Sequence, residues 1–557
     1  MAYLRKNVSK GIEYWSLCEN KRVDGKVVRI TLEYFGSARH MAEMLSARKL
    51  SSPVLDKMGW TDGVTVISRI HGSVAALVAV AKKIGITEIF DFCLPKRERA
   101  GVGRGTALLA AAIQRACQPG SKNVFASWVR KTTLPSLLGL PTDGKTLTSQ
   151  VFWEMMDGLT ESDLAAAEDA VTGKLLALYN PERTRLALDY TNYYSYISSS
   201  NIKCSIARRG HNKQKRNDLR QYSLAIVSTH NPAFPLFSML YEGNLNDVIA
   251  FGGYYQMLQG RLGQGFDKST LTLVFDGGSV NKTNLAMLDM HFISSFPLSS
   301  AKELYDIDIG EYNHVTIGGG REVLCYRIEK KTIWGRVLSC VLTYSQELYD
   351  GQMLDLERKI EKKREFACEI QLRVDNPKAR LDKTAEGVRK AMALDKMLTT
   401  LISVGLDDKG KVLFDVDEDA KEIYARKIFG KKLIVTDQLG WTTEAIISAY
   451  REQGDIEGIF RDSKDVSHFS VRPQYHYTDE KVRVHVFCCL VGLILATALN
   501  QEMKLAGIHA NNRSVLDTLE DVRMAWVMPQ GQGGEIQVIE TMEDAAAKMW
   551  EAVQQIH

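Results

Sequence analysis

The chain has 557 residues, 45% hydrophobic and 25% charged, which is the composition of a globular protein and excludes a disordered or fibrous one. This length exceeds what one hydrophobic core supports, so two to four domains are expected. The 71 basic and 67 acidic residues leave a net charge of only +4, so overall charge does not indicate a nucleic-acid partner and local clusters must be sought. The nine cysteines include no CxxC pair, which argues against a zinc site or a disulfide framework and indicates a reducing, cytoplasmic location.

Two features bear on membrane targeting. The N-terminal residues MAYLRKNVSKG lack the apolar core of a signal peptide. The strongest apolar run, VFCCLVGLILATAL (486–499), has 14 residues, fewer than the ~20 that cross a bilayer. We therefore expect a buried core helix there, with Cys488 and Cys489 as buried thiols, and no membrane partner.

The first predicted unit spans residues 1–180. VVRITLEYFG (27–36) alternates between apolar and polar side chains and predicts strands before about residue 40. The remainder is mainly helical in pattern, for example GTALLAAAIQRACQ (105–118). GVGRG (101–105) lacks the GK[ST] of a phosphate-binding loop and a convincing preceding strand, so a glycine-rich helix start is expected there.

From about residue 181 the pattern changes to short apolar or alternating runs separated by turn residues, which predict strands of one sheet. These runs are RTRLALDYTNYYSYI (183–197), QYSLAIVST (221–229) and STLTLVFDGG (269–278). Strand-like and then long charged helical patterns fill residues 281–430, and KKLIVTD (431–437) resumes an apolar strand. The simplest organisation is a core of residues 181–280 and 431–500, interrupted by an insertion at 281–430 and followed by a helical tail at 501–557.

Asp189 and Asp276 each end one of these apolar runs and are followed directly by turn-like residues. If the two strands are parallel neighbours, both carboxylates emerge at the same edge of the sheet. Carboxylates within ~4 Å repel unless a cation or proton lies between them, and oxygen ligands suit Mg²⁺ or Mn²⁺. Either Asp could equally cap a strand–turn junction, and Asp91 and Asp437 occupy similar positions, so spacing alone does not select the pair.

The stretch YREQGDIEGIFRDSK (450–464) predicts a short amphipathic helix. At ~100° per residue one face carries an apolar stripe and the adjoining face carries an acid beside two cations. The stripe is Ile456, Ile459 and Phe460, and the polar face is Glu457, Arg461 and Lys464. An ordinary surface helix with a Glu457–Arg461 pair would show the same pattern.

Several ordered stretches together resemble the DDE transposases of bacterial insertion sequences, in the insertion-sequence-four-like group with a Y-x2-R-x3-E-x6-K signature. Tyr450, Glu457 and Lys464 occupy the Y, E and K positions, while Gln453 replaces the arginine and Arg451 lies close by. The stretches that resemble the other motifs of the group are LDYTNYYSY with RRGHNKQKRNDLRQYSLAIV, YEGNLND, FDGGSVNKTNL, RPQYHYTDEKVRVHVFCCLVGL and ACQPGSKNVFASWVRKTTLP. The resemblance covers most of the chain.

The resemblance implies an α/β fold with a ribonuclease-H-like core, interrupted by the insertion domain, and a mainly helical N-terminal region that binds DNA ends. It implies that Asp189, Asp276 and Glu457 hold two Mg²⁺ (or Mn²⁺) ions. Water would cut a strand at the element's end, and the resulting 3′-hydroxyl would attack target DNA, or the opposite strand as a hairpin. The implied partner is double-stranded DNA, both terminal inverted repeats and target, bound by a homodimer in the cytoplasm at the bacterial or archaeal nucleoid.

Further features extend the predicted DNA surface. By the resemblance, Tyr450 and Lys464 hold a phosphate near the cut. Residues 203–220 hold seven Lys or Arg and one Asp, a density also common in solvated hairpins. Trp334 could stack on an unpaired base or be a core tryptophan. The residues predicted to contact DNA are Tyr450, Arg451, Arg461, Lys464, Arg208, Arg209, His211, Lys213, Lys215, Arg216 and Trp334.

Other functions remain open at this level. One is a catalytically inactive DNA-binding protein derived from a transposase, for which Gln453 is the only support and against which the three acids argue. Another is a nuclease with a different role on the same fold. A carboxylate-pair glycosidase is disfavoured, because its mechanism calls for no basic residues around both motifs.

Overall fold

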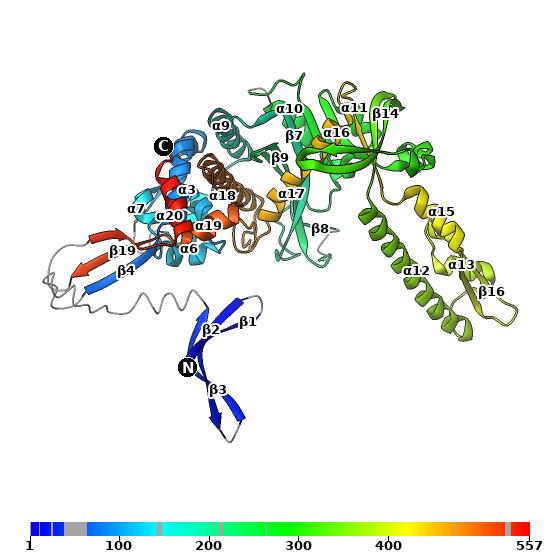
Figure 1. Ribbon diagram of the computed structural model, residues 1–557, viewed down its shortest axis with the longest axis horizontal. Coiled ribbons are helices and arrows are strands. Elements are labelled where there is room, and N and C mark those ends of the chain that lie inside the picture. Colours follow the sequence, from blue (N-terminus) through cyan, green and yellow to red (C-terminus); the bar gives the residue numbers. More distant parts are fainter. Residues whose placement is uncertain are drawn as a thin grey trace.

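The computed structural model describes residues 2–9, 12–23, 26–37, 64–141, 147–210, 216–262, 265–472, 474–529 and 536–557. His211, Lys213 and Lys215, predicted to contact DNA, lie outside the described residues. The fold is mixed α/β: a large central sheet lies between a helical region that contains the C-terminus and a projecting arm (Figure 1).

The central sheet has ten strands. In chain order they are β7 (Glu182–Ser195), β8 (Arg208–Arg209), β9 (Arg220–His230), β10 (Pro235–Glu242), β11 (Thr272–Phe275), β12 (His291–Phe296), β13 (Asn313–Ile317), β14 (Arg321–Ile333), β15 (Arg336–Tyr344) and β18 (Lys431–Thr436). Their spatial order is β10-β9-β7-β11-β12-β18-β15-β14-β13, with β8 paired to β9. β7, β9 and β10 are antiparallel neighbours, whereas β11 is parallel to both β7 and β12. The parallel strands β7, β11 and β12 therefore end at one edge of the sheet.

Helices cover both faces of the sheet because its central strands are apolar on both sides. Phe275 of β11 packs on Phe251 of α10 (Asp247–Arg261), with ring centroids 5.2 Å apart. Val274 belongs instead to a buried cluster with Ile446 and Ile447 of α16 (Thr443–Arg451). Successive residues of a strand point to opposite faces, so α10 and α16 lie on opposite sides of β11. The uninterrupted apolar character of this run is typical of a strand buried on both faces.

The N-terminal helices pack around α18 (Asp479–Leu505). They are α3 (Gly72–Ile84), α4 (Ile86–Cys93), α5 (Arg104–Cys117), α6 (Lys122–Val129), α7 (Leu134–Leu138), α8 (Ser149–Met155) and α9 (Glu161–Tyr179). Among the described helices only α18 is long and apolar enough to cross a membrane, and 94% of its most apolar window is buried inside the protein. It is a core helix, as expected for residues 486–499, and its two cysteines are buried thiols.

The stretch 281–430 has two structural parts. Its strands β12 to β15 hydrogen-bond into the central sheet. Residues 346–429 have their own hydrophobic core and form the projecting arm in Figure 1. The arm contains α12 (Gln346–Asp375), α13 (Ala385–Met392), α14 (Leu398–Leu401), β16 (Ile402–Leu406), β17 (Val412–Val416) and α15 (Glu418–Ile428). The domain boundaries drawn from the sequence remain a prediction.

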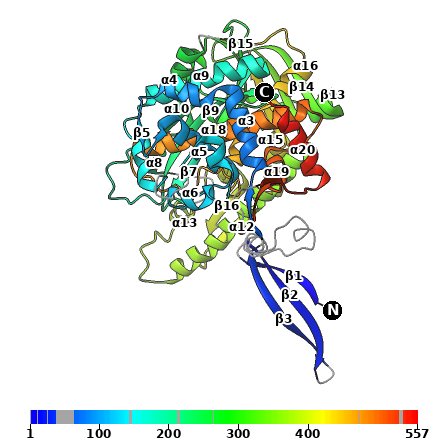
Figure 2. The ribbon, with the colours of Figure 1, turned by 90° about the vertical axis from the view of Figure 1, so that its left-hand side faces the viewer.

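The strands predicted before about residue 40 are present, whereas the C-terminal stretch contains strands that the sequence pattern did not reveal. The stretch 501–557 holds α19 (Asn512–Glu520) and α20 (Asp544–Gln554), as a helical tail would. It also holds β19 (Arg523–Pro529) and β20 (Ile536–Ile539), which form a three-stranded sheet with β4 (Val64–Ile70). These strands depend on a partner far away in sequence. β1 (Ala2–Ser9), β2 (Ile12–Val23) and β3 (Lys26–Ser37) form a separate antiparallel sheet (Figure 2).

Gly492 marks the closest approach of α18 to α5. A Cβ at this position would lie 2.6 Å from the carbonyl oxygen of Ala112, so Gly492→Ala should lower the unfolding free energy by about 1–3 kcal/mol through overpacking. Gly173→Ala is the matched control on α9, where a Cβ meets no described atom within 4 Å, and should raise it by about 0.5–1 kcal/mol. Denaturant unfolding measures both signs, and a Gly492→Ala protein as stable as wild type would contradict this packing.

Candidate active site

Two aspartates lie side by side on neighbouring parallel strands. Asp276 directly follows β11, as predicted, but Asp189 does not end its strand, because β7 continues to Ser195 through its pairing with β9. Leu188 of β7 and Phe275 of β11 are register partners, so Asp189 and Asp276, the next residues, occupy equivalent positions on neighbouring strands. Paired strands lie ~4.8 Å apart. The parallel, adjacent arrangement on which the sequence argument depends is therefore present in the structure.

Glu457 comes from α17 (Gln453–Asp462), the helix that follows α16. Ile456, Ile459 and Phe460 are buried, and α17 contacts β7 and β9, so this face holds the helix on the sheet. Glu457 and Arg461 are exposed on the adjoining face. The two faces that the sequence pattern predicts are thus confirmed.

The three carboxylates line one cavity of about 620 Å³, together with several cationic and hydroxyl groups. The cavity also contains Tyr190, Thr191, Lys432, Tyr450, Arg451, Gln453, Gly454, Phe460, Arg461 and Lys464. Three acids and four cations therefore face one space, although they come from strands and helices far apart in the sequence.

Asp276 is held by hydroxyl groups from two directions. Its Oδ1 accepts a hydrogen bond from Ser295 Oγ at 3.1 Å and another from the Tyr450 hydroxyl at 3.1 Å. Burial raises the pKa of Asp276, but the backbone of Gly277, the charge of Lys432 and these two hydroxyls outweigh it, so the pKa lies below the usual value. The carboxylate is therefore anionic at neutral pH.

Cationic side chains hold positions around the carboxylates. Lys432 Nζ lies 4.5 Å from the centroid of the Tyr450 ring. Desolvation lowers the pKa of Lys432, and the opposite charges of Asp276 and Glu457 counteract that effect. Lys464 Nζ contacts the Thr191 hydroxyl and lies 5.7 Å from the Tyr193 ring centroid. Anions such as phosphate groups would meet a positive surface beside the acids.

Lys432 was missed by the sequence reasoning. It is the second residue of β18, which runs antiparallel to β12, so the start of β18 lies at the edge where β12 ends. The signal available in the sequence was a lysine at the beginning of an apolar strand. Only the pairing of that strand with β12 shows that this lysine lies near Asp276.

The donor set fits a hard divalent ion by chemical type. Mg²⁺ and Mn²⁺ prefer carboxylate oxygens, and three carboxylates from three elements line the cavity. Within the described ranges, however, no group of three or more His, Cys, Asp or Glu residues is arranged closely enough to hold a metal ion. Asp189 Oδ1 accepts from the backbone N–H of Tyr190 at 2.7 Å, and Asp276 from hydroxyls. Binding an ion would therefore require these side chains to turn toward one another.

Among the described residues, the other predicted DNA contacts do not line the cavity. Arg208 is 4.0 Å from Glu242, Arg209 donates to Ser199, and Arg216 forms a two-bond pair with Asp218 at 2.9 Å. The Trp334 ring stacks on Phe296 with centroids 5.3 Å apart. Of the signature residues, Tyr450 and Gln453 are buried, whereas Arg451 is exposed at the cavity.

Comparison with known proteins does not identify a family for this chain. No family model matches the chain, and no curated protein matches it. Among solved structures, the chain is similar to a piggyBac transposase in a synaptic complex with hairpin DNA, with a TM-score of 0.35 and 8% identity, over 78% of this chain and 70% of that one. A likeness this distant assigns neither fold nor activity, so function must be argued from the site.

Tyr450→Phe removes the hydroxyl that donates to Asp276 and keeps the buried ring. We expect the unfolding free energy to fall by about 0.5–1.5 kcal/mol at neutral pH, the value of one hydrogen bond. Because the hydroxyl helps to depress the pKa of Asp276, its contribution is full above the ordinary Asp value of 3.8 and is lost as pH falls through the depressed one. Denaturant unfolding at neutral and at acid pH measures this difference.

Tyr312→Phe is the matched control for this change. The Tyr312 hydroxyl is buried and has no hydrogen-bond partner among the described residues. Its removal should cost nothing at either pH. An equal loss of stability in both variants would contradict the role given to the Tyr450 hydroxyl.

Proposed function

We propose that this protein is a metal-dependent DNA transposase of the DDE type, with a ribonuclease-H-like core. The observation that carries the proposal is the cavity in which Asp189, Asp276 and Glu457 face four cationic side chains. Carboxylates alone suit many hydrolases. Carboxylates beside phosphate-binding cations suit phosphodiester chemistry.

The topology of the sheet supports the same proposal. The order β10-β9-β7-β11-β12, with β7, β11 and β12 parallel and β9 antiparallel, is that of a ribonuclease-H-like core. In that frame one acid lies within the first strand, a second directly follows the fourth strand, and the third lies on a helix after the core is interrupted. The sequence signature around Glu457 resembles that of the insertion-sequence-four-like transposases and supports the proposal of that group.

The residues of the cavity have distinct roles in this proposal. Asp189, Asp276 and Glu457 would hold two Mg²⁺ or Mn²⁺ ions, which activate an attacking oxygen and stabilise the leaving oxygen of a phosphodiester. Arg461, on the exposed side of α17, and Lys464, just beyond the end of that helix, would bind a phosphate of the strand being cut. Tyr450 donates to Asp276, so it orients that carboxylate rather than contacting DNA.

The reaction that these roles serve has two stages. Hydrolysis of a phosphodiester at the element's end leaves a 3′-hydroxyl, and that hydroxyl then attacks a second phosphodiester and displaces its 3′ oxygen. The same cavity serves both stages because each is an in-line substitution at phosphorus. A DNA-binding protein that no longer cuts remains the second candidate, because Gln453 occupies the arginine position of the signature and the acids are not drawn together.

Glu457→Gln tests the assignment directly, because it keeps the shape of the side chain and removes its charge. With Mg²⁺ and a labelled duplex that carries the element's own end, wild type should cut and the variant should be slower by at least ~100-fold, equivalent to a few kcal/mol of lost charge stabilisation. DNA binding by the variant should persist.

Glu444→Gln is the control for this experiment. Glu444 is exposed in the first turn of α16 and does not line the cavity. The Glu444→Gln protein should therefore cut the labelled duplex at the wild-type rate. Cutting by Glu457→Gln at the wild-type rate would contradict the role assigned to Glu457. Wild-type protein that binds DNA but does not cut it under Mg²⁺ or Mn²⁺ would favour the inactive DNA-binding protein. Cutting without strand transfer would favour a nuclease of another role.

Lys464→Met tests the phosphate contact separately from the chemistry. The methionine keeps the apolar stem against Tyr193 and removes the charge. If Lys464 meets a DNA phosphate, the slope of log K against log salt should decrease in magnitude by about 0.9. Fluorescence anisotropy over a salt series measures the slope, with exposed Lys548→Met as the reference. Identical slopes for the two variants would exclude the contact.

A further inference from the structure

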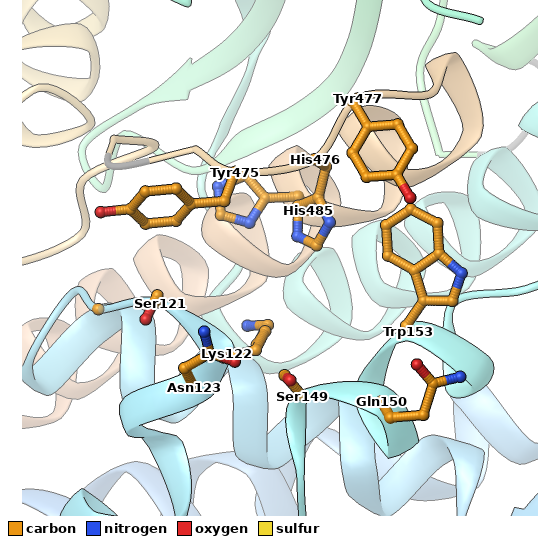
Figure 3. Close-up of a pocket in the computed structure, with 11 residues that line it drawn as sticks. Ser121, Lys122, Asn123, Ser149, Gln150, Trp153, Tyr475, His476, Tyr477 and His485 are labelled. Atoms are coloured by element: carbon orange, nitrogen blue, oxygen red, sulfur yellow. The ribbon is translucent and has the colours of Figure 1, made fainter. Parts of the chain in front are cut away.

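A second cavity, of about 560 Å³, lies between the N-terminal helices and the segment that follows the signature. Figure 3 shows Lys122, Asn123 and Ser149 on one wall, facing Tyr475, His476 and His485 on the other. Its size is that of pockets which hold small ligands. The roles proposed above for phosphodiester chemistry at the carboxylate cavity involve none of these residues.

The electrostatics of this cavity favour an anion. Its lining residues, all within the described part of the chain, include Lys122 but no Asp or Glu. The guanidinium of Arg115 donates to the carbonyl of Gly120 in the cavity wall at 2.9 Å. Lys481, whose Nζ lies 5.2 Å from the Trp153 ring centroid, is already paired with Asp157 at 2.6 Å and adds little free positive charge. α6 begins at Lys122, so its first backbone N–H groups lie at this wall, where helix N-termini attract negative charge.

Lys122 lacks the partner that a buried ammonium group needs. Its Nζ is buried and has no hydrogen-bond partner in the described structure, and its nearest described ring, Phe152, has its centroid 5.4 Å away. Burial lowers the pKa of Lys122 to about 8, so the group is still cationic at neutral pH. A buried, unpaired cation is costly, and an anion in the cavity would offset that cost.

His485 shows that the occupant must also donate a hydrogen bond. The side chain is 3% exposed, and its Nε2 lies 2.8 Å from the carbonyl oxygen of Val471, so Nε2 carries the hydrogen. Nδ1 is then an acceptor, and it has no partner among the described residues. Burial lowers the pKa of His485 and of His476, so both rings are neutral. A simple anion satisfies Lys122 but not this nitrogen.

Aromatic rings form the rim of the cavity. Trp153 and Tyr477 stack with centroids 5.1 Å apart and an interplanar angle of 28°. Tyr475 is 67% exposed and Tyr477 48% exposed. Exposed aromatic rings beside a cationic pocket are what proteins use to stack unpaired bases.

A strand of DNA can connect this cavity to the carboxylates. Asp189 and Thr191 of β7 line the carboxylate cavity, and Ser195 of the same strand donates to Gln474 Oε1 at 3.3 Å. Gln474 directly precedes Tyr475. Six residues of extended strand span ~20 Å, which is about six nucleotide steps.

We propose that this second cavity binds a nucleotide, with the phosphate at Lys122 and the first N–H groups of α6, and the base against Trp153 or Tyr475. The base supplies the donor that His485 Nδ1 lacks, for example the N3–H of thymine. The source of the nucleotide rests on the proposed function: it is an unpaired nucleotide of the DNA bound at the carboxylates. A free mononucleotide offers the same groups, and the test separates the two.

The test uses full-length protein with a chelator present, so that it does not depend on cleavage. A labelled oligothymidylate with one 5-iodouracil is bound, irradiated and mapped by mass spectrometry. The crosslink should fall on Trp153, Tyr475 or Tyr477. Lys122→Met should weaken binding by roughly 10-fold or more, while the exposed Lys174→Met should not. Crosslinks elsewhere, or equal binding by the two variants, would overturn the proposal.

Competition identifies the source of the nucleotide. Thymidine monophosphate that displaces the oligonucleotide only at much higher concentration supports a DNA strand as the ligand, and equal potency supports a free nucleotide. Inorganic phosphate as potent as the mononucleotide would overturn the proposal, because the base would then contribute nothing. A protein that cuts no DNA but still gives these crosslinks would remove the proposed function and leave the nucleotide cavity standing.

Discussion

The parallel pairing of β7 with β11 is the constraint on which the site depends. It fixes Asp189, within β7, beside Asp276, which directly follows the end of β11. Two unit charges at a strand spacing of ~4.8 Å repel by roughly 3 kcal/mol at an effective dielectric constant of ~20. The groups that compensate at Asp276 are Ser295, Tyr450 and Lys432, which come from β12, α16 and β18. Elements later in the chain therefore complete a site that the first strands create.

The projecting arm can interrupt this core without disturbing it. Tyr344 at the end of β15 and Lys431 at the start of β18 are register partners, and Ser345 N–H donates to the carbonyl of Gly430 at 2.9 Å. The chain thus leaves and re-enters the sheet at a hydrogen-bonded pair. Because the arm has its own hydrophobic core, its folding does not compete with that of the sheet. Asp276 and Glu457 are therefore far apart in the sequence but line the same cavity.

The local sequence pattern was sufficient to predict those elements whose structure is decided by burial alone. The strands around residues 183–197 and 269–278 and the two faces of α17 followed from periodicity, because each apolar run packs against the sheet in the expected way. Pairing between distant segments could not be read from the sequence. β19 is a strand because β4 lies beside it, and Lys432 reaches Asp276 because β18 pairs with β12. Lys122 and His485 line the second cavity together. They are far apart in the sequence, and no motif spacing links them.

The distribution of basic residues explains why composition was a poor guide to binding. In the basic run 203–220, Arg220 is buried and its guanidinium donates to four backbone carbonyls, and Arg216 pairs with Asp218. Such residues stabilise the fold. Breaking their contacts in order to bind DNA would cost free energy, because their partners would be left unpaired. Lys122 lies beside an aromatic ring, and Lys464 contacts a hydroxyl and lines the cavity of the three acids. The proposed phosphate contacts are therefore a few individually placed cations, and the density of Lys and Arg along the sequence does not identify them.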